Sequence, residues 1–248
     1  MKKLFMCGLL LASVIAFGQE TVTRNLSSFN KLDIGGSFEA FIEQGSQESV
    51  KIIAEGVSPE RIITEVNGST LEIHMEHGEY HNIRVKIYLT YKNLEEINKS
   101  GSGSLTCNSD LAASDFKLYI SGSGNTIISK KIKAQQVTLN KSGSGNVKLG
   151  ALETDDADLS LSGSGSFEIS DGRAKKQSLS ISGSGSISAY GVKSDECVAS
   201  ITGSGDIHVT VSQILEGRIA GSGSIIYQGD AQIKQAGIIG SGRISRKS

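Results

Sequence analysis

The segment LSISGSGSISA, residues 179–189, decides the fold. Apolar or glycine residues alternate with serine along its whole length, which is typical of a strand that buries one face. Gly183 and Gly185 fall on the buried face, where a strand that bends around a narrow interior has no room for a β-carbon. The segment therefore predicts two short strands joined at a Gly-Ser-Gly corner, with the serine side chains pointing outward.

The Gly-Ser-Gly triplet recurs eight times, at intervals of 18 to 21 residues, and its apolar flanks keep the same phase. Flexible Gly/Ser linkers keep no such phase, whereas a fixed period near ~20 residues is typical of a solenoid. Stacked coils would pair their strands in parallel at ~4.8 Å per coil. The predicted fold is therefore an all-β parallel β-helix, or β-solenoid, of about eight coils. Its predicted structural corners are Gly101, Gly103, Gly122, Gly124, Gly143, Gly145, Gly163, Gly165, Gly183, Gly185, Gly203, Gly205, Gly221, Gly223, Gly240 and Gly242.

The composition suits a thin solenoid and argues against a nucleic-acid partner. Aromatic residues make up 5% of the chain and tryptophan is absent, so Ile, Val and Leu must fill the core. The formal net charge is −1, and loss of Lys2 and Lys3 with a leader makes the mature chain more negative. A chain of this charge is not expected to bind nucleic acid or an anionic membrane surface.

Residues 1–18 read as a signal peptide. A basic start, Lys2-Lys3, precedes an apolar stretch over 4–17, and Ala16-Phe17-Gly18 supplies small residues for cleavage. A retained anchor helix is the alternative, although the stretch is short for a membrane span. The mature chain is thus expected in the periplasm, on the outer-membrane surface or outside the cell, with no transmembrane span after cleavage.

The mature chain divides into two predicted parts. Residues 19–96 form an N-terminal, mostly β cap with one short helix that starts at Ser58-Pro59. Residues 97–248 form the Gly-Ser-Gly solenoid, and the stretch 32–42 repeats its corner pattern once, as a degenerate first coil.

Two cysteines remain in the mature chain, and both are expected to be unpaired. Cys107 and Cys197 lie about four coils apart, or roughly 19 Å at the spacing of parallel strands. A disulfide needs Cα atoms within ~7 Å of each other.

Lys99 and Lys141 depart from the repeat, because each occupies a slot that is apolar in the other coils. A buried, unpaired lysine is costly. A β-bulge that turns each lysine outward is therefore expected.

The sequence offers no convincing catalytic, cofactor or metal site. His74, His77 and His81 are weak zinc candidates, because their spacing matches no defined site and His74 falls on the exposed face of a strand. Asp155, Asp156 and Asp158 could hold calcium but fit a solvated turn better. The eight triplet serines lack the elbow, histidine and aspartate of a nucleophilic site and indicate a structural ladder.

The stretch Leu32-Asp-Ile-Gly-Gly-Ser-Phe-Glu-Ala40 and the serial Ser-Gly-Ser-Gly-(Asn/Ser)-Ile/Val motifs resemble the "head GIN domain" family of putative autotransporter adhesins. The resemblance covers residues 29–243. It implies a mostly β, solenoid-like protein that is secreted or surface-associated in Gram-negative bacteria. It supplies no catalytic residue.

Two functions of different class follow from these observations. The first is an exported, non-enzymatic binding module, an adhesin, that presents a Ser/Thr/Asn-rich face to a glycan, a lipid or a protein, with Tyr88 and Tyr190 as candidate platforms for a sugar. The second is a structural protein of the cell envelope without a soluble ligand. A polysaccharide-active β-helix enzyme is the third possibility, and no cofactor is expected.

Overall fold

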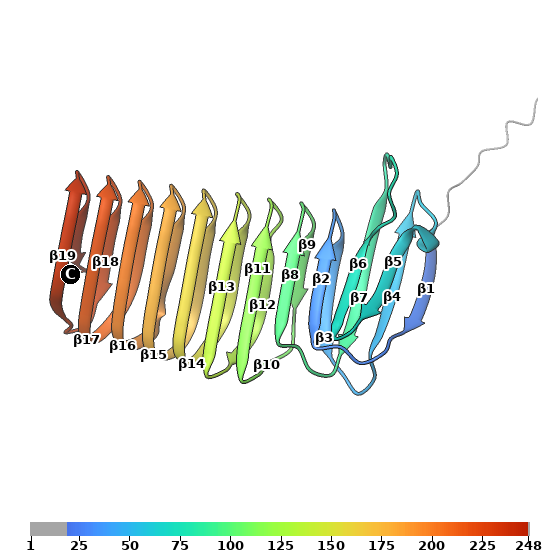
Figure 1. The fold of residues 1–248 in the computed structure, drawn as a ribbon, viewed down its shortest axis with the longest axis horizontal. Helices are drawn as coiled ribbons and strands as arrows, with labels where there is room; N and C mark the ends of the chain where they lie inside the picture. The colour runs from blue at the N-terminus through green and yellow to red at the C-terminus, as the bar shows by residue number, and fades with distance from the viewer. Residues whose placement is uncertain (1–18, 248) are drawn as a thin grey trace, which may run out of the picture.

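The computed structural model describes residues 19–247, which form an elongated solenoid of stacked β-coils (Figure 1). Its twenty strands belong to one hydrogen-bonded sheet that winds around a narrow core. The predicted fold class is therefore confirmed. The predicted signal peptide, residues 1–18, lies outside the described residues, and no helix within 19–247 is long and apolar enough to span a bilayer.

Each repeat coil rises along one wall, turns at its Gly-Ser-Gly triplet and descends along the opposite wall (Figure 1). In the later coils one long strand runs from one triplet to the next, so that it also forms the third, lower side of the coil. The strands of the repeat region are β8 (Glu96–Ser100), β9 (Ser104–Cys107), β10 (Leu111–Ala112), β11 (Asp115–Ser121), β12 (Thr126–Lys133), β13 (Gln136–Ser142), β14 (Asn146–Gly163), β15 (Ser166–Gly183), β16 (Ser186–Gly203), β17 (Asp206–Gly221), β18 (Ser224–Gln228), β19 (Gln232–Gly240) and β20 (Arg243–Arg246).

Neighbouring coils pair in parallel, and equivalent residues are in register apart from local shifts where β12 pairs with β14, β16 with β17 and β17 with β19. Leu118, Leu139, Leu159, Leu179 and Ala199 form one continuous inward row. The triplets stack in the same way, since β14, β15 and β16 pair glycine to glycine at their corners. The parallel stacking that the period predicts is therefore confirmed.

The N-terminal region adds one coil out of sequence order. β2 (Lys31–Gly35) and β3 (Glu39–Gln44) pair in parallel with β8 and β9, which confirms that the stretch 32–42 forms a coil of the solenoid. On their other side they pair with β6 (Thr70–Met75) and β7 (Arg84–Tyr91). The chain thus enters the solenoid one coil inside its end and returns to build the outer coil afterwards.

Three antiparallel strands complete this end (Figure 1). β5 (Ile62–Asn67) pairs with β6, β4 (Ser49–Glu55) with β7, and β1 (Glu20–Asn25) with β4. The expected short helix is a single 3-10 turn, η1 (Pro59–Arg61). Ser58 precedes this turn, but its hydroxyl donates to the Glu60 carboxylate instead of capping the backbone.

The core is a thin column of aliphatic side chains, as the composition predicts. Cys107 and Cys197 are buried in it as free thiols, which confirms that they are unpaired. Burial raises the pKa of the Cys197 thiol to about 12. Both thiols are therefore protonated at neutral pH.

Candidate functional site

A groove of about 710 Å³ runs along the outer face of one wall of the solenoid. Its floor is formed by β2, β8, β11 and β13 and by the ends of β14, β15 and β16 that lead into their corners. The groove crosses the strands, so it follows the long axis of the molecule. Seven coils are separated by six spacings of ~4.8 Å, so the floor is roughly 29 Å long.

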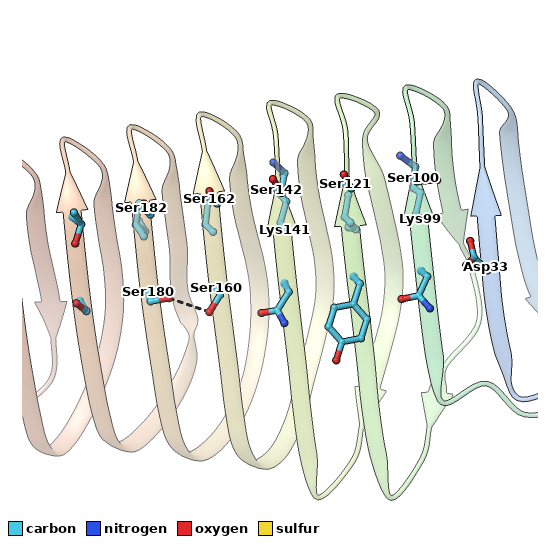
Figure 2. A pocket seen from close by; sticks show the side chains of 18 residues that line it. Asp33, Lys99, Ser100, Ser121, Lys141, Ser142, Ser160, Ser162, Ser180 and Ser182 are labelled. Carbon is cyan, nitrogen blue, oxygen red and sulfur yellow. Dashed lines mark hydrogen bonds between the residues drawn. The ribbon is translucent and has the colours of Figure 1, made fainter. Parts of the chain in front are cut away.

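Two rows of side chains line the groove, with one residue of each row per coil, except that Gly35 takes the corner position on β2 (Figure 2). The corner row stands directly before each triplet and contains Ser100, Ser121, Ser142, Ser162, Ser182 and Thr202. The central row stands two residues earlier and contains Asp33, Asn98, Tyr119, Asn140, Ser160, Ser180 and Ser200. Both rows are outward-facing because side chains alternate along a strand.

Some polar groups of these two rows already form hydrogen bonds within the protein, so they are less available to a ligand than the others. The Ser160 and Ser180 hydroxyls lie 3.0 Å apart and share one hydrogen bond (Figure 2). The Asn98 amide donates to Glu96 Oε1 at 2.9 Å. The backbone amides below are engaged in the parallel ladder, so a ligand in the groove would meet side chains alone.

Asp33 supplies the negative charge at one end of the central row. Partial burial is the main cause that raises its pKa, and repulsion from Glu72 and Glu96 adds to it, while His74 acts in the opposite direction. Glu72 is the register neighbour of Asp33 on β6. The rest of the central row, from Asn98 to Ser200, is uncharged.

Lys99 and Lys141 lie behind the groove, and the expected bulges are absent. β8, β11 and β13 pair without a register shift, and the two lysines are only 4% and 3% exposed. Their side chains extend toward the corners (Figure 2). Lys141 Nζ donates to Gly143 O at 2.9 Å, whereas Lys99 Nζ has no hydrogen-bond partner among the described residues. Burial lowers the pKa of both amines, and the charge of Lys141 lowers that of Lys99 further.

Lys141 can point inward because the following coil has a glycine, Gly165, beside its side chain. A β-carbon built on Gly165 would lie 2.2 Å from Lys141 Nζ. In a regular coil the same space holds an isoleucine, as at Gly205, where the β-carbon would lie 2.8 Å from Ile181 Cγ2. The lysine stem therefore replaces an aliphatic side chain without disturbing the strand.

The structure does not bring the candidate metal ligands together. His74 lies exposed on β6, and His77 and His81 lie in the loop between β6 and β7. Across residues 19–247 no group of three or more His, Cys, Asp or Glu side chains could hold a metal ion. Asp155 instead pairs with Lys175 at 2.8 Å.

The two tyrosines proposed as platforms are stacked on other side chains. Tyr88 lies 5.1 Å from the Phe41 ring, centroid to centroid. The Tyr190 ring lies 5.0 Å from the His208 ring, and Lys247 Nζ lies 4.5 Å from the centroid of the Tyr190 ring.

Tyr119, which is the aromatic residue of the groove, was not singled out in the sequence analysis. The available signal was its position three residues before a triplet, the same as that of Asn98 and Asn140.

Known proteins support this architecture. The chain resembles the crystal structure of a putative adhesin from Parabacteroides merdae, with a TM-score of 0.89, 24% identity, and coverage of 93% of this chain and 96% of that one. It also resembles a putative lipid binding protein from Parabacteroides distasonis, with a TM-score of 0.85, 29% identity, and coverage of 93% and 97%. No match was found among curated proteins.

A family model described as "Putative auto-transporter adhesin, head GIN domain" matches residues 28–231. This range covers most of the chain, including the cap strands after β1, the groove and seven of the eight triplets. The chain therefore belongs to the head GIN domain family of putative auto-transporter adhesins.

Proposed function

We propose that this protein is an exported, non-catalytic adhesion module that binds its ligand along the groove of the central and corner rows. The observation that carries the proposal is the in-register alignment of hydroxyl and amide side chains over neighbouring coils in one hollowed surface. The adhesin family to which the chain belongs supports a binding role. Export rests on the leader that the sequence predicts over residues 1–18.

The groove favours an extended ligand. Its polar groups repeat at ~4.8 Å along the molecular axis, so a chain-like molecule can make the same contact on successive coils. The strands beneath are already paired on both sides, which leaves no sheet edge within the groove for strand addition. Affinity would then come from many modest contacts instead of one deep pocket.

The lining also favours binding over hydrolysis. Most glycosidases place two carboxyl groups on either side of the bond that they break. Within the two rows Asp33 is the single carboxylate, and it stands at one end. The competing function, a structural envelope protein without a soluble ligand, would leave the groove unused.

Blocking the groove tests the proposal. Beads coated with residues 19–248 are applied to mucin-coated plastic and to epithelial cells, and retained beads are counted under flow. The double variant Ser160→Arg/Ser180→Arg places two bulky side chains on neighbouring coils of the central row. We expect it to reduce retention at least ~10-fold, as the loss of a central contact does in other interfaces.

A matched variant on the opposite wall controls for charge and stability. Ser166 and Ser186 are also register neighbours on adjacent coils, but they face away from the groove. Ser166→Arg/Ser186→Arg should retain beads as the parent does. Absence of retention by the parent on both surfaces, or equal loss in the two double variants, would contradict the proposed function.

A further inference from the structure

We infer that the groove takes a linear, uncharged glycan, and that Asn98, Tyr119 and Asn140 form its principal contact. This inference rests on the proposed function and names the ligand class of the same groove. Its basis is the juxtaposition of an aromatic ring and two amides on three successive coils.

The three residues are consecutive in the central row. Tyr119 pairs in register with Asn98 on one side and with Asn140 on the other. All three are half-buried, so each is held by its surroundings while part of it faces the groove. Tyr88 and Tyr190 are engaged in stacked pairs, whereas Tyr119 takes part in no aromatic stack among residues 19–247.

The chemistry of this trio matches a sugar. Each amide offers donors and an acceptor, and vicinal sugar hydroxyls present the same combination. A tyrosine ring gives an apolar surface with a polar edge, which suits the mixed C–H and O–H character of a pyranose. The serines that continue the row toward Ser200 can both donate and accept, so they extend the contact along a polymer.

The electrostatics favour an uncharged chain. No cationic side chain stands in either row. Lys99 and Lys141 also border the groove, but their side chains are almost fully buried. Phosphate and sulfate groups are usually bound by arginine, lysine or free backbone amides, and the rows present none of these. At the other end, Asp33 would repel an acidic sugar.

A lipid chain is matched less well. Carbon atoms make up the larger part of the exposed groove surface, but the two rows end in hydroxyl and amide groups, which an acyl chain would leave without hydrogen-bond partners. Inside the solenoid, the cavity beside Phe38 and Lys99 measures only about 10 Å³, which is near the space needed for one water. The P. distasonis relative described as lipid-binding makes lipid the class to be tested against glycan.

The experiment measures binding of residues 19–248 to two kinds of probe. The first is a set of neutral hexasaccharides: β-1,4-glucan, α-1,4-glucan, β-1,4-mannan and N-acetylated chitin oligomers. The second is vesicles of phosphatidylcholine, alone and with phosphatidylglycerol. We expect saturable binding to at least one hexasaccharide and none to the vesicles. Binding to vesicles but to no hexasaccharide would overturn the inference in favour of a lipid.

Variants locate the contact. Tyr119→Ala should weaken hexasaccharide binding at least ~10-fold, because truncation of a central aromatic anchor removes most of its contact surface. Tyr119→Phe should keep most of the affinity, and Tyr190→Ala on the opposite wall should keep all of it. Thermal melting of each variant confirms folding. Unchanged binding by folded Tyr119→Ala would overturn the assignment of the trio.

The two proposals fail in different ways. If beads adhere and Ser160→Arg/Ser180→Arg abolishes adhesion, but neither the hexasaccharides nor periodate oxidation of the target surface reduces it, the groove binds a ligand that is not a glycan. If adhesion does not depend on the groove at all, the proposed function itself fails.

Discussion

Replacement of Gly183 by valine is expected to lower the free energy of unfolding by at least ~2 kcal/mol, because the substitution adds strain and overpacking at one corner. Gly183 has a φ angle of +127°, in a region that side-chain-bearing residues rarely adopt. A β-carbon at this position would lie 2.5 Å from the carbonyl oxygen of Gly163 in the preceding coil. Valine must therefore distort the backbone that pairs the two coils, and chemical denaturation of the variant measures the loss.

The neighbouring serine provides the control. Ser184 is exposed at the corner, and its backbone amide, which donates to Gly163 O at 3.1 Å, is retained in an alanine variant. Ser184→Ala should change stability by less than ~0.5 kcal/mol, as most surface substitutions do. If Gly183→Val and Ser184→Ala shift the denaturation midpoint equally, the assigned role of the corner glycines is wrong.

Replacement of Lys99 by isoleucine should stabilise the protein by ~1–3 kcal/mol at pH 7, the range expected when a buried polar group without a partner is replaced by an apolar one. Lys99 is 4% exposed, and its Nζ has no partner among the described residues. Isoleucine occupies the same slot at Ile120, one coil away. Lys141→Ile should give a smaller gain, because Lys141 Nζ donates a hydrogen bond to Gly143 O.

The same substitution should alter the pH dependence of stability. Burial lowers the pKa of Lys99 in the folded state, so in the alkaline range between its folded pKa and its ordinary value of 10.5 the unfolded chain binds more protons. Stability therefore rises with pH across that window, and the cost of the buried charge is greatest below it. Thermal melts of the parent and of Lys99→Ile from pH 7 to pH 11 should differ in this slope. Parallel curves, or a destabilised variant, would contradict the assignment.

The repeat architecture could be predicted because every repeat coil contains the same Gly-Ser-Gly triplet with apolar residues at fixed distances from it. A triplet with apolar residues in fixed phase specifies both the corner and the register, so the pairing of Leu159 with Leu179 follows from the sequence alone. The insertion of β2 and β3 between the coil of β6 and β7 and the coil of β8 and β9 could not be predicted. Strand order at the cap depends on pairing between segments far apart in the sequence, and the local alternation of apolar and polar residues does not specify such pairing.

The inward position of Lys99 and Lys141 is a second feature that could not be predicted from the sequence. The cost of burying an amine is evident from the sequence, and it led to the expectation of a bulge. The space that makes the inward position possible lies beside Gly165, one coil away from Lys141, and it becomes visible only when the coils are stacked. The hydroxyl-rich face of the site was similarly predictable from alternation, but the isolation of Tyr119 and the stacking of Tyr190 on His208 depend on neighbours in other coils.

The absence of tryptophan from the chain permits a direct test of ligand binding in the groove. Tyr119→Trp places a single fluorescent reporter between Asn98 and Asn140 and keeps an aromatic ring there. Tyr190→Trp places the same reporter on the opposite wall. During titration with the hexasaccharide that binds most tightly, we predict a saturable change in emission from Tyr119→Trp and none from Tyr190→Trp. Constant emission from Tyr119→Trp while the sugar binds, or a change confined to Tyr190→Trp, would contradict the account.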